Sequence, residues 1–342
     1  MRKSRIALTV IAFFLLSFQQ VSKYTFEYPS FFPKPAYDFT NNQLDSNKVE
    51  LGRLLFYDGI LSKDNSISCS TCHSPFNAFA HNDHNLSHGI NDEIGIRNAP
   101  VLFNLAWQGS FMWDGSINHL DMQALAPISS PIEMGDNITN VVEKLQNDAF
   151  YRNKFYRAYN DSIVTGERVL KVLSQFQLTL ISANSKYDKV KRGEVEFSNQ
   201  ESKGYKLFQK KCNSCHQEPL FSTYKFAKNF IPIDSNLNDF GKGSISKLKA
   251  DSLLFKIPSL RNLEYSFPYM HDGRYFTVKT VLDHYTAPET HLKFKNEGLK
   301  KIQLSEKEKM DLIAFIETLN DKEFVFDPKH RFPRELLMKW NN

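Results

Sequence analysis

The sequence predicts a mainly α-helical protein of two domains. Apolar residues recur at the three- and four-residue spacing of amphipathic helices, and no stretch keeps the alternation of a strand. A Cys-x-x-Cys-His pattern occurs twice, at residues 69–73 and 212–216. The chain of 342 residues is long enough for two domains of ordinary size, one around each pattern.

The two Cys-x-x-Cys-His patterns predict covalently attached haem. The two thiols of such a pattern form thioether bonds to the porphyrin, and the histidine supplies an axial nitrogen to the iron. The alternatives are a zinc site or disulfide bonds. However, the pairs are far apart, a histidine follows each, and bonds within them would constrain little chain. We therefore expect two c-type haems, attached at Cys69, Cys72, Cys212 and Cys215, with His73 and His216 as iron ligands.

The composition is compatible with a haem protein and excludes one class of partner. The formal charge of +5 is modest and spread along the chain, so no nucleic-acid partner is expected. Aromatic residues make up 13% of the chain, which is enough to surround two large apolar macrocycles.

Residues 1–22 are predicted to be a signal peptide or an N-terminal anchor. Basic residues come first, and an apolar run from Ile6 to Phe18 follows, which is typical of an export signal. The run is short for a stable membrane span, although an uncleaved anchor stays open. Haem of this type is attached outside the cytoplasm, so we expect a periplasmic protein.

Residues 23–193 are predicted to form the first domain. Its apolar pattern predicts a helix over residues 46–57 that leads into the first Cys-x-x-Cys-His pattern, and further helices over 137–159 and 165–183. The polar loop after the pattern carries three histidines, which suggest an axial ligand or a metal site. The basic run at residues 186–192 closes the domain.

Residues 194–342 are predicted to form the second domain. A helix over residues 200–209 leads into the second pattern, and another covers residues 278–285. Ser305 and Glu308 form a capping-box pattern at the start of a last amphipathic helix. Residues 227–256 are polar and receive no assignment.

The order of the short motifs resembles the bacterial diheme cytochrome c peroxidase family, which includes MauG-like proteins. Between about Val49 and Leu319 these motifs are CSTCH, RNAP, MWDG, PIEM, CNSCH, FKIPSLRN and YMHDGR. The resemblance implies two cytochrome c-like domains, in which the N-terminal haem meets hydrogen peroxide and the C-terminal haem passes electrons to it. It also implies an electron donor such as a monohaem cytochrome c or a cupredoxin.

The resemblance assigns catalytic roles to three residues. Glu133 matches the active-site carboxylate, which would move a proton between the two oxygens of peroxide. Gln123 matches a glutamine that forms hydrogen bonds in the same pocket, and Trp113 matches a tryptophan between the haems. A surface acid, a surface amide and a buried core aromatic are the respective structural alternatives.

Calcium and axial-ligand positions are also implied by the resemblance. Asn98, Ser266 and the carbonyl of Pro268 match the ligands of a calcium ion, which prefers oxygen. His88 matches a loop histidine that ligates the N-terminal haem at rest and leaves before peroxide binds. His81 and His84 are its competitors.

Tyr285 departs from the pattern of the peroxidases that place a methionine at this position, and in this respect it resembles MauG-like proteins. A phenolate ligand stabilises ferric iron and lowers the potential of the C-terminal haem. Tyr285 could instead be a packing residue, with His284 or Met270 as the ligand.

Three functions stay open. Peroxide reduction is the leading hypothesis, MauG-like oxidation of a protein or organic substrate is the second, and electron transfer without catalysis is the third. The Glu133–Gln123 pair argues against a simple carrier, which has no need of it. Both a monomer and a homodimer are compatible with the sequence.

Overall fold

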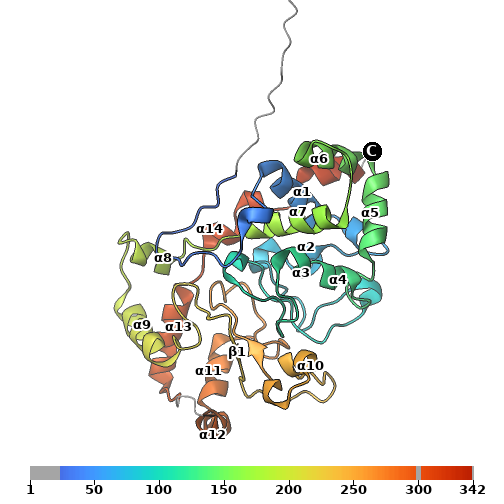
Figure 1. The fold of residues 1–342 in the computed structure, drawn as a ribbon. Helices are drawn as coiled ribbons and strands as arrows, with labels where there is room; N and C mark the ends of the chain where they lie inside the picture. The colour runs from blue at the N-terminus through green and yellow to red at the C-terminus, as the bar shows by residue number, and fades with distance from the viewer. Residues whose placement is uncertain (1–23, 298–301, 341–342) are drawn as a thin grey trace, which may run out of the picture.

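The computed structural model describes residues 24–297 and 302–340, and the predicted signal or anchor at residues 1–22 lies outside them. Over the described residues the fold is mainly helical, as predicted (Figure 1). Its only sheet there pairs two short antiparallel strands, β1 (Phe226–Ala227) and β2 (Phe255–Lys256).

Long connections precede α3, α10 and α11, and the other described α-helices follow one another more closely along the chain. The α-helices are α1 (Ser46–Tyr57), α2 (Cys69–Cys72), α3 (Leu120–Gln123), α4 (Leu125–Ser129), α5 (Ile138–Asn147), α6 (Ala149–Tyr159), α7 (Gly166–Leu178), α8 (Lys186–Lys191), α9 (Asn199–Lys211), α10 (Lys242–Ser246), α11 (Val278–Thr286), α12 (Pro288–Asn296), α13 (Glu306–Glu317), α14 (Lys322–Val325) and α15 (Arg334–Trp340). Short 3₁₀ helices are η1 (Phe39–Asn41), η2 (Gly59–Leu61), η3 (Pro75–Asn77), η4 (Ile90–Asp92), η5 (Leu105–Trp107), η6 (Lys249–Asp251) and η7 (Pro328–His330).

Two crossing helix pairs carry the two haem motifs. Helix α1 packs on α7, and α9 packs on α13. A Cβ atom on Gly52 would lie 1.8 Å from the carbonyl oxygen of Val172, and one on Gly204 would lie 1.9 Å from that of Asp311. Only glycine permits backbones to approach so closely. In each half, therefore, two helices cross at a glycine, and the first helix of the pair leads toward the Cys-x-x-Cys-His motif.

The buried apolar residues form two cores. The larger one surrounds α1 and α7, and the smaller one surrounds α9 and α13. Figure 1 shows the first pair in the upper half of the molecule and the second pair in the lower half. Tyr187 packs in the smaller core, whereas Phe324 and Leu336 pack in the larger one, so the chain returns to the first core at its end. The domain boundary between residues 193 and 194 stays a prediction.

Several predicted helices have the expected bounds. Helix α1 covers residues 46–57, and α13 begins with the predicted capping box, in which Glu308 accepts a hydrogen bond from the Ser305 N–H at 2.8 Å. The helix predicted over residues 137–159 is instead divided into α5 and α6. Asp148 causes the division, because its backbone is extended and its carboxylate caps α6.

The helix predicted over residues 165–183 ends early, at Leu178. The residues after Leu178 contact the segment around Asn104 instead of continuing the helix. The N–H of Ser182 donates to Oδ1 of Asn104 at 3.0 Å. None of the helices in the described ranges is long and apolar enough to cross a membrane.

Candidate functional site

One cavity of about 630 Å³ is lined by both haem motifs. This volume lies in the range of cofactor pockets, and the wall is mostly apolar, as such pockets are. Most of the residues that the sequence singled out lie in its wall: Cys69, Cys72, His73, His88, Asn98, Trp113, Gln123, Glu133, Cys212, Cys215, His216, Ser266, Pro268 and Tyr285. The fold thus brings residues from across the chain around a single space.

The two motif histidines are oriented to bind a metal. Nδ1 of His73 lies 2.9 Å from the carbonyl oxygen of Phe79, and Nδ1 of His216 lies 3.1 Å from that of Pro258. A carbonyl only accepts hydrogen bonds, so each Nδ1 carries the proton and each Nε2 keeps its lone pair. Burial lowers the pKa of both imidazoles to about 4, which keeps them neutral at pH 7.

The four cysteines suit covalent attachment of haem. None of the four forms a disulfide, and all of them lie in the cavity wall. Burial raises the pKa of Cys69 and of Cys212 to about 12 and that of Cys72 to about 11, so these thiols are protonated at neutral pH. The cavity, the paired thiols and the oriented imidazoles together fit two c-type haems.

Two packed loops bring His88 and Glu133 together beside the first motif. The N–H of Ile90 donates to the carbonyl of Glu133 at 2.8 Å. A Cβ atom on Gly89 would lie 2.1 Å from the carbonyl oxygen of Ile132, so only glycine lets the loops meet this closely. The carbonyl of His88 in turn lies 3.5 Å from Sγ of Cys72.

Of the three loop histidines, only His88 lies in the cavity wall among the described residues. Its Nδ1 is 2.7 Å from Oδ1 of Asp92, and its ring stacks on that of His84 at 4.3 Å between centroids. His81 lies beyond His84, at 5.4 Å between their rings. This arrangement favours His88 over its competitors as an axial ligand.

The predicted catalytic carboxyl group lies in a partly desolvated position. Burial raises the pKa of Glu133 above its ordinary value, and a hydrogen bond with Ser130 opposes the shift. Gln123 lies at the end of α3, with its Nε2 3.8 Å from Sδ of Met112. A carboxyl group with a raised pKa can hold a proton closer to neutral pH, as acid–base catalysis requires.

Trp113 is held by backbone hydrogen bonds from both sides. Its Nε1 donates to the carbonyl of Asn98 at 2.9 Å, and its own carbonyl accepts the N–H of Lys256 at 2.8 Å. Lys256 belongs to β2, in the second half of the chain, so residues from both halves fix the tryptophan.

Four charged residues around Trp113 were missed by the sequence interpretation. Arg97 contacts Asp114 at 2.6 Å and Asp239 at 2.6 and 2.8 Å. Lys256 is half-buried, and its Nζ donates to Oε1 of Gln108 at 2.8 Å and to the carbonyl of Ser110 at 2.9 Å. The RNAP and MWDG motifs contain Arg97 and Asp114, but no sequence signal points to Asp239.

Burial also shifts the titration of Lys256. It lowers the pKa of this ammonium group to about 7, and the nearby Asp114 opposes the shift.

Two candidates for the axial position reach the cavity beside the second motif. Tyr285 on α11 and Met270 both lie in the wall. Burial raises the pKa of the Tyr285 phenol. His284 is not in this wall among the described residues, and its Nε2 is 2.8 Å from the carbonyl oxygen of Asn229. Tyr285 and Met270 are therefore the better placed.

The three predicted calcium ligands lie in the wall of the same cavity. The Nδ2 of Asn98 donates to the carbonyl of Asn85 at 3.0 Å, which leaves its Oδ1 for a cation. Ser266 donates to the carbonyl of Asn262 at 3.1 Å. Within the described ranges no group of three or more acidic, histidine or cysteine residues could hold a metal ion, so a calcium ion here would depend on neutral oxygens.

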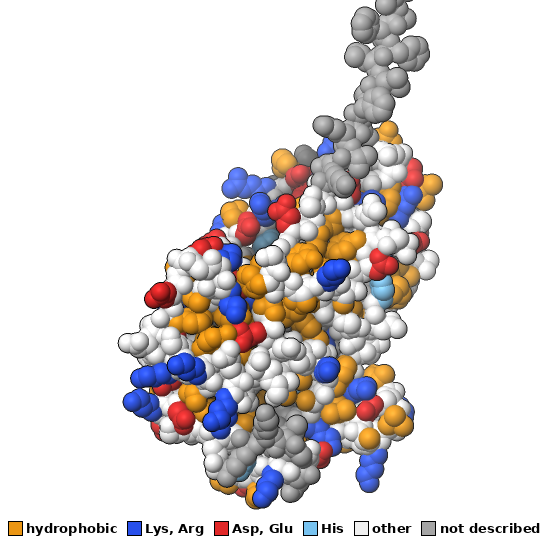
Figure 2. Space-filling model, turned by 60° about the vertical axis from the view of Figure 1, so that its left-hand side comes forward, with side chains coloured by type: hydrophobic (Ala, Val, Ile, Leu, Met, Phe, Trp, Pro, Cys, Tyr) orange, Lys and Arg blue, Asp and Glu red, His pale blue; other side chains and the backbone are white. Residues whose placement is uncertain are grey.

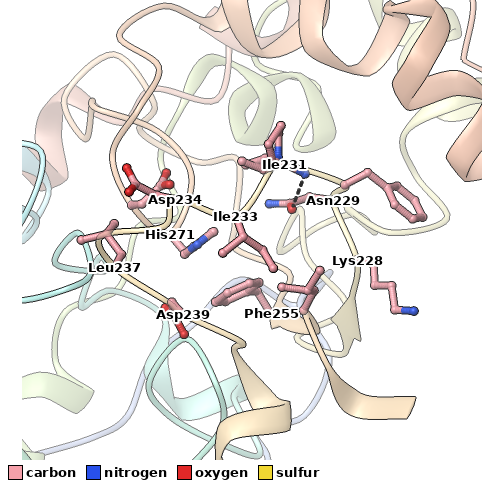
Figure 3. Close-up of a pocket in the computed structure, with 13 residues that line it drawn as sticks. Lys228, Asn229, Ile231, Ile233, Asp234, Leu237, Asp239, Phe255 and His271 are labelled. Atoms are coloured by element: carbon pink, nitrogen blue, oxygen red, sulfur yellow. Dashed lines mark hydrogen bonds between the residues drawn. The ribbon is translucent and has the colours of Figure 1, made fainter. Parts of the chain in front are cut away.

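A second, small cavity adjoins the first near His271 (Figure 3). It has a volume of about 30 Å³ and is lined by Asp239, Phe255 and His271 among others. The ring of His271 stacks on that of Phe255 at 3.8 Å. This cavity is far smaller than the one that both haem motifs line.

Family profiles match both halves of the chain. The profile described as di-haem cytochrome c peroxidase matches residues 46–196, and the one described as cytochrome c matches residues 201–320. These matches agree with the two motifs and the fit of the cavity, and the chain carries two c-type haems.

Individual proteins give the same result. The chain is 35% identical to the methylamine utilization protein MauG of Methylorubrum extorquens, with 87% of this chain and 84% of the relative covered. It is 31% identical to the cytochrome c551 peroxidase of Nitrosomonas europaea, with 80% of each covered. A solved structure of a MauG-like protein associated with microbial copper homeostasis superimposes with a TM-score of 0.78 at 27% identity, covering 91% of this chain and 99% of that one.

The repeated helix crossing, the shared cavity and relatives that align over at least four fifths of the chain lead to one assignment. The chain belongs to the di-haem cytochrome c peroxidase family, as an oxidoreductase that takes peroxide as its substrate and electrons from a redox partner.

Proposed function

We propose that this protein reduces hydrogen peroxide to water at the N-terminal haem and receives the electrons through the C-terminal haem. The single cavity that both motifs line carries this proposal, because it places the two haems in one continuous space. The reaction consumes two electrons and two protons for each peroxide and yields two water molecules. The bound haems supply the electron-transfer chemistry, and the side chains around them manage protons and position.

Glu133 is the proposed proton-transferring group. Its carboxyl group would accept a proton from one peroxide oxygen and donate it to the leaving oxygen. The position in the cavity wall beside the first motif and the raised pKa both support this role. Gln123, in the same wall, would orient peroxide by hydrogen bonding.

Trp113 is the proposed electron-transfer residue between the haems. Its hydrogen bonds to Asn98 and Lys256 would keep the indole in a fixed position. We also propose that His88 ligates the first iron at rest, and that its exposed loop lets it leave when peroxide binds. Tyr285 is the proposed ligand of the second iron, with Met270 as the alternative.

Several further assignments belong to the proposal. Asn98, Ser266 and the Pro268 carbonyl would bind one calcium ion. Residues 1–22 would direct export to the periplasm, where a monohaem cytochrome c or a cupredoxin would donate electrons. The protein would work as two domains, residues 23–193 and 194–342, in a monomer or a homodimer.

Steady-state turnover with a reduced redox protein tests the proposal. The holoprotein is mixed with a ferrous monohaem cytochrome c, and oxidation is followed by absorbance with and without hydrogen peroxide. Peroxide-dependent oxidation of two cytochromes for each peroxide is the expected result. Cytochrome oxidation that proceeds equally well without peroxide would contradict the proposal.

A MauG-like oxidase is the second candidate, because Tyr285 lies in the wall beside the second motif. In such an enzyme, peroxide would oxidise the diferric protein by two electrons, and the two haems and Trp113 would hold these two oxidising equivalents. Absorbance spectra recorded after peroxide is added to diferric protein, with no donor present, separate the two candidates. A long-lived spectral change that a donor protein does not discharge would favour the oxidase.

A further inference from the structure

The outer face of α9 presents lysines to solvent. Gly204 and Phe208 are buried against α13 and define the inner face of this helix. With 3.6 residues per turn, positions 203, 206 and 210 lie on the opposite side. All three are exposed lysines, and we name Lys203, Lys206 and Lys210 the lysine face of α9.

The lysine face is not paired with acidic side chains among the described residues. Within the described ranges, none of its three ammonium groups forms an ion pair, whereas the one acidic residue of α9, Glu201, pairs with Lys186 at 2.7 Å. Glu308 lies near the end of the helix, where hydrogen bonds from Ser305 and the charges of the last two lysines of α9 lower its pKa, but it forms no ion pair with either lysine among the described residues. Lysines near a helix C-terminus also stabilise the helix by interacting with the negative end of its dipole, which accounts for Lys210 but not for Lys203 near the other end.

The lysine face ends where the second haem motif reaches the surface. Helix α9 ends at Lys211, and Cys212 follows directly. Lys211 and Ser214 both lie in the wall of the large cavity, and Ser214 is also exposed to solvent. Figure 2 shows Lys and Arg side chains gathered at the left of the lower half of the molecule, the half that contains α9.

The corresponding surface of the first motif has no such charge. On α1, Arg53 pairs with Glu50 at 3.1 Å. In the segment that leads from α1 to the first motif, Lys63 is followed by Asp64. The two halves share the glycine crossing and the haem motif, but of the two described helices that lead to the motifs, only α9 carries a group of three exposed lysines without ion pairs.

We propose that the lysine face of α9 is the docking surface for the electron donor, and that the donor is a small redox protein with acidic residues around its redox centre. The inference rests on the proposed function, because it names the partner that would supply electrons to the second haem. Opposite charges on the two surfaces steer the encounter and raise association rates by about 10- to 1000-fold at low salt. Screening at 0.1 M salt limits the effect to about 10 Å, so only lysines near the contact contribute.

The test compares two charge forms of one donor. Ferrous monohaem cytochrome c is used in its lysine-rich native form and after succinylation, which turns its lysines into carboxylates. Anaerobic stopped-flow absorbance measures how fast each form reduces the haem of the diferric holoprotein, without peroxide, at 10 and 200 mM salt. This measures docking and electron entry even if the protein has no peroxidase activity.

The decisive variant is Lys203→Glu/Lys206→Glu/Lys210→Glu. Its control reverses three exposed basic residues elsewhere, Lys34→Glu/Arg157→Glu/Lys329→Glu, with the same change in net charge. We expect the succinylated donor to react faster with the wild type, by at least about tenfold at low salt, and to lose this advantage only in the α9 variant. Circular dichroism and haem content check that both variants fold and carry haem.

Other results would overturn the inference. A faster reaction with the native, basic donor, or an equal loss in the control variant, would show that the lysine face does not select the partner. A change in sedimentation of the α9 variant from dimer to monomer would identify the face as a contact between two copies. If docking depends on α9 but peroxide turnover with a small chemical reductant is absent, the proposed function fails and the docking surface stands.

Discussion

Replacing Arg97 with methionine is expected to destabilise the protein by about 3–5 kcal/mol, the cost of leaving buried charges without a partner. The guanidinium makes three hydrogen bonds of 2.6–2.8 Å to two carboxylates. The side chains of Asp114 and Asp239 are only 8% and 3% exposed, so water cannot replace Arg97 as their partner. Lysine at this position keeps the positive charge but cannot form the paired hydrogen bonds of a guanidinium group. Arg97→Lys should therefore reduce the stability less than Arg97→Met.

The effect should depend on pH in a defined direction. Burial alone would raise the pKa of Asp239, but the hydrogen bonds and charge of Arg97 outweigh it and hold the pKa below its ordinary value. A carboxyl group with a lowered pKa stabilises the fold above its unfolded pKa of about 3.9, and this contribution is lost as pH falls through the folded pKa. The difference between wild type and Arg97→Met should therefore be largest near pH 7 and shrink below about pH 4.

Urea unfolding followed by circular dichroism measures both effects. Arg168 and Asp161 provide a matched control, since this ion pair is also bidentate but lies at the surface, with 25% and 39% exposure. Arg168→Met should change stability far less. Adding Asp239→Asn to Arg97→Met should recover part of the loss, because one unpaired charge is removed. A cost below about 1 kcal/mol for Arg97→Met, as for exposed pairs, would refute the role given to burial here.

Three further substitutions test separate parts of the account. Glu133→Gln should retain both haems, as measured by pyridine haemochrome absorbance. Its peroxide turnover should fall by about 10²–10⁴-fold, because the amide cannot transfer the proton. Full turnover would show that Glu133 has no part in the mechanism. Gly204→Ala should destabilise the second core by about 1–3 kcal/mol in urea unfolding, because its Cβ would overlap the carbonyl of Asp311. Gly109→Ala is the control and should cost far less, because Gly109 has open space around it and no positive φ. Tyr285→Phe should raise the potential of the second haem in a spectroelectrochemical titration, and an unchanged potential would favour Met270 as its ligand.

Local patterns predicted much of the fold. The bounds of α1 and the start of α13 follow from apolar spacing and capping residues, which act within a few positions. The same reasoning failed at Asp148, because a residue that is acceptable on a helix surface is also a good N-cap. Local preference alone could not decide between one long helix and two short ones.

The functional site was also predictable from the sequence only in part. Both haem motifs are local patterns, and the cavity joins them with the residues that the family resemblance indicated. Contacts between distant segments gave no sequence signal. Arg97 and Asp239 are far apart in the chain, and half-buried Lys256 looks like an ordinary surface lysine in sequence. Partners of this kind depend on how the two halves pack, which periodicity does not encode.

The most direct test of the central claim is stopped-flow absorbance of the holoprotein mixed with hydrogen peroxide, before and after one reducing equivalent is added per molecule. We expect the diferric protein to react slowly, because His88 ligates the first iron and blocks peroxide. The half-reduced protein should react at once, and its second haem should become oxidised. The same experiment on Glu133→Gln should show a slower reaction. Haem spectra that do not respond to peroxide in either state would contradict the account and identify the protein as an electron carrier.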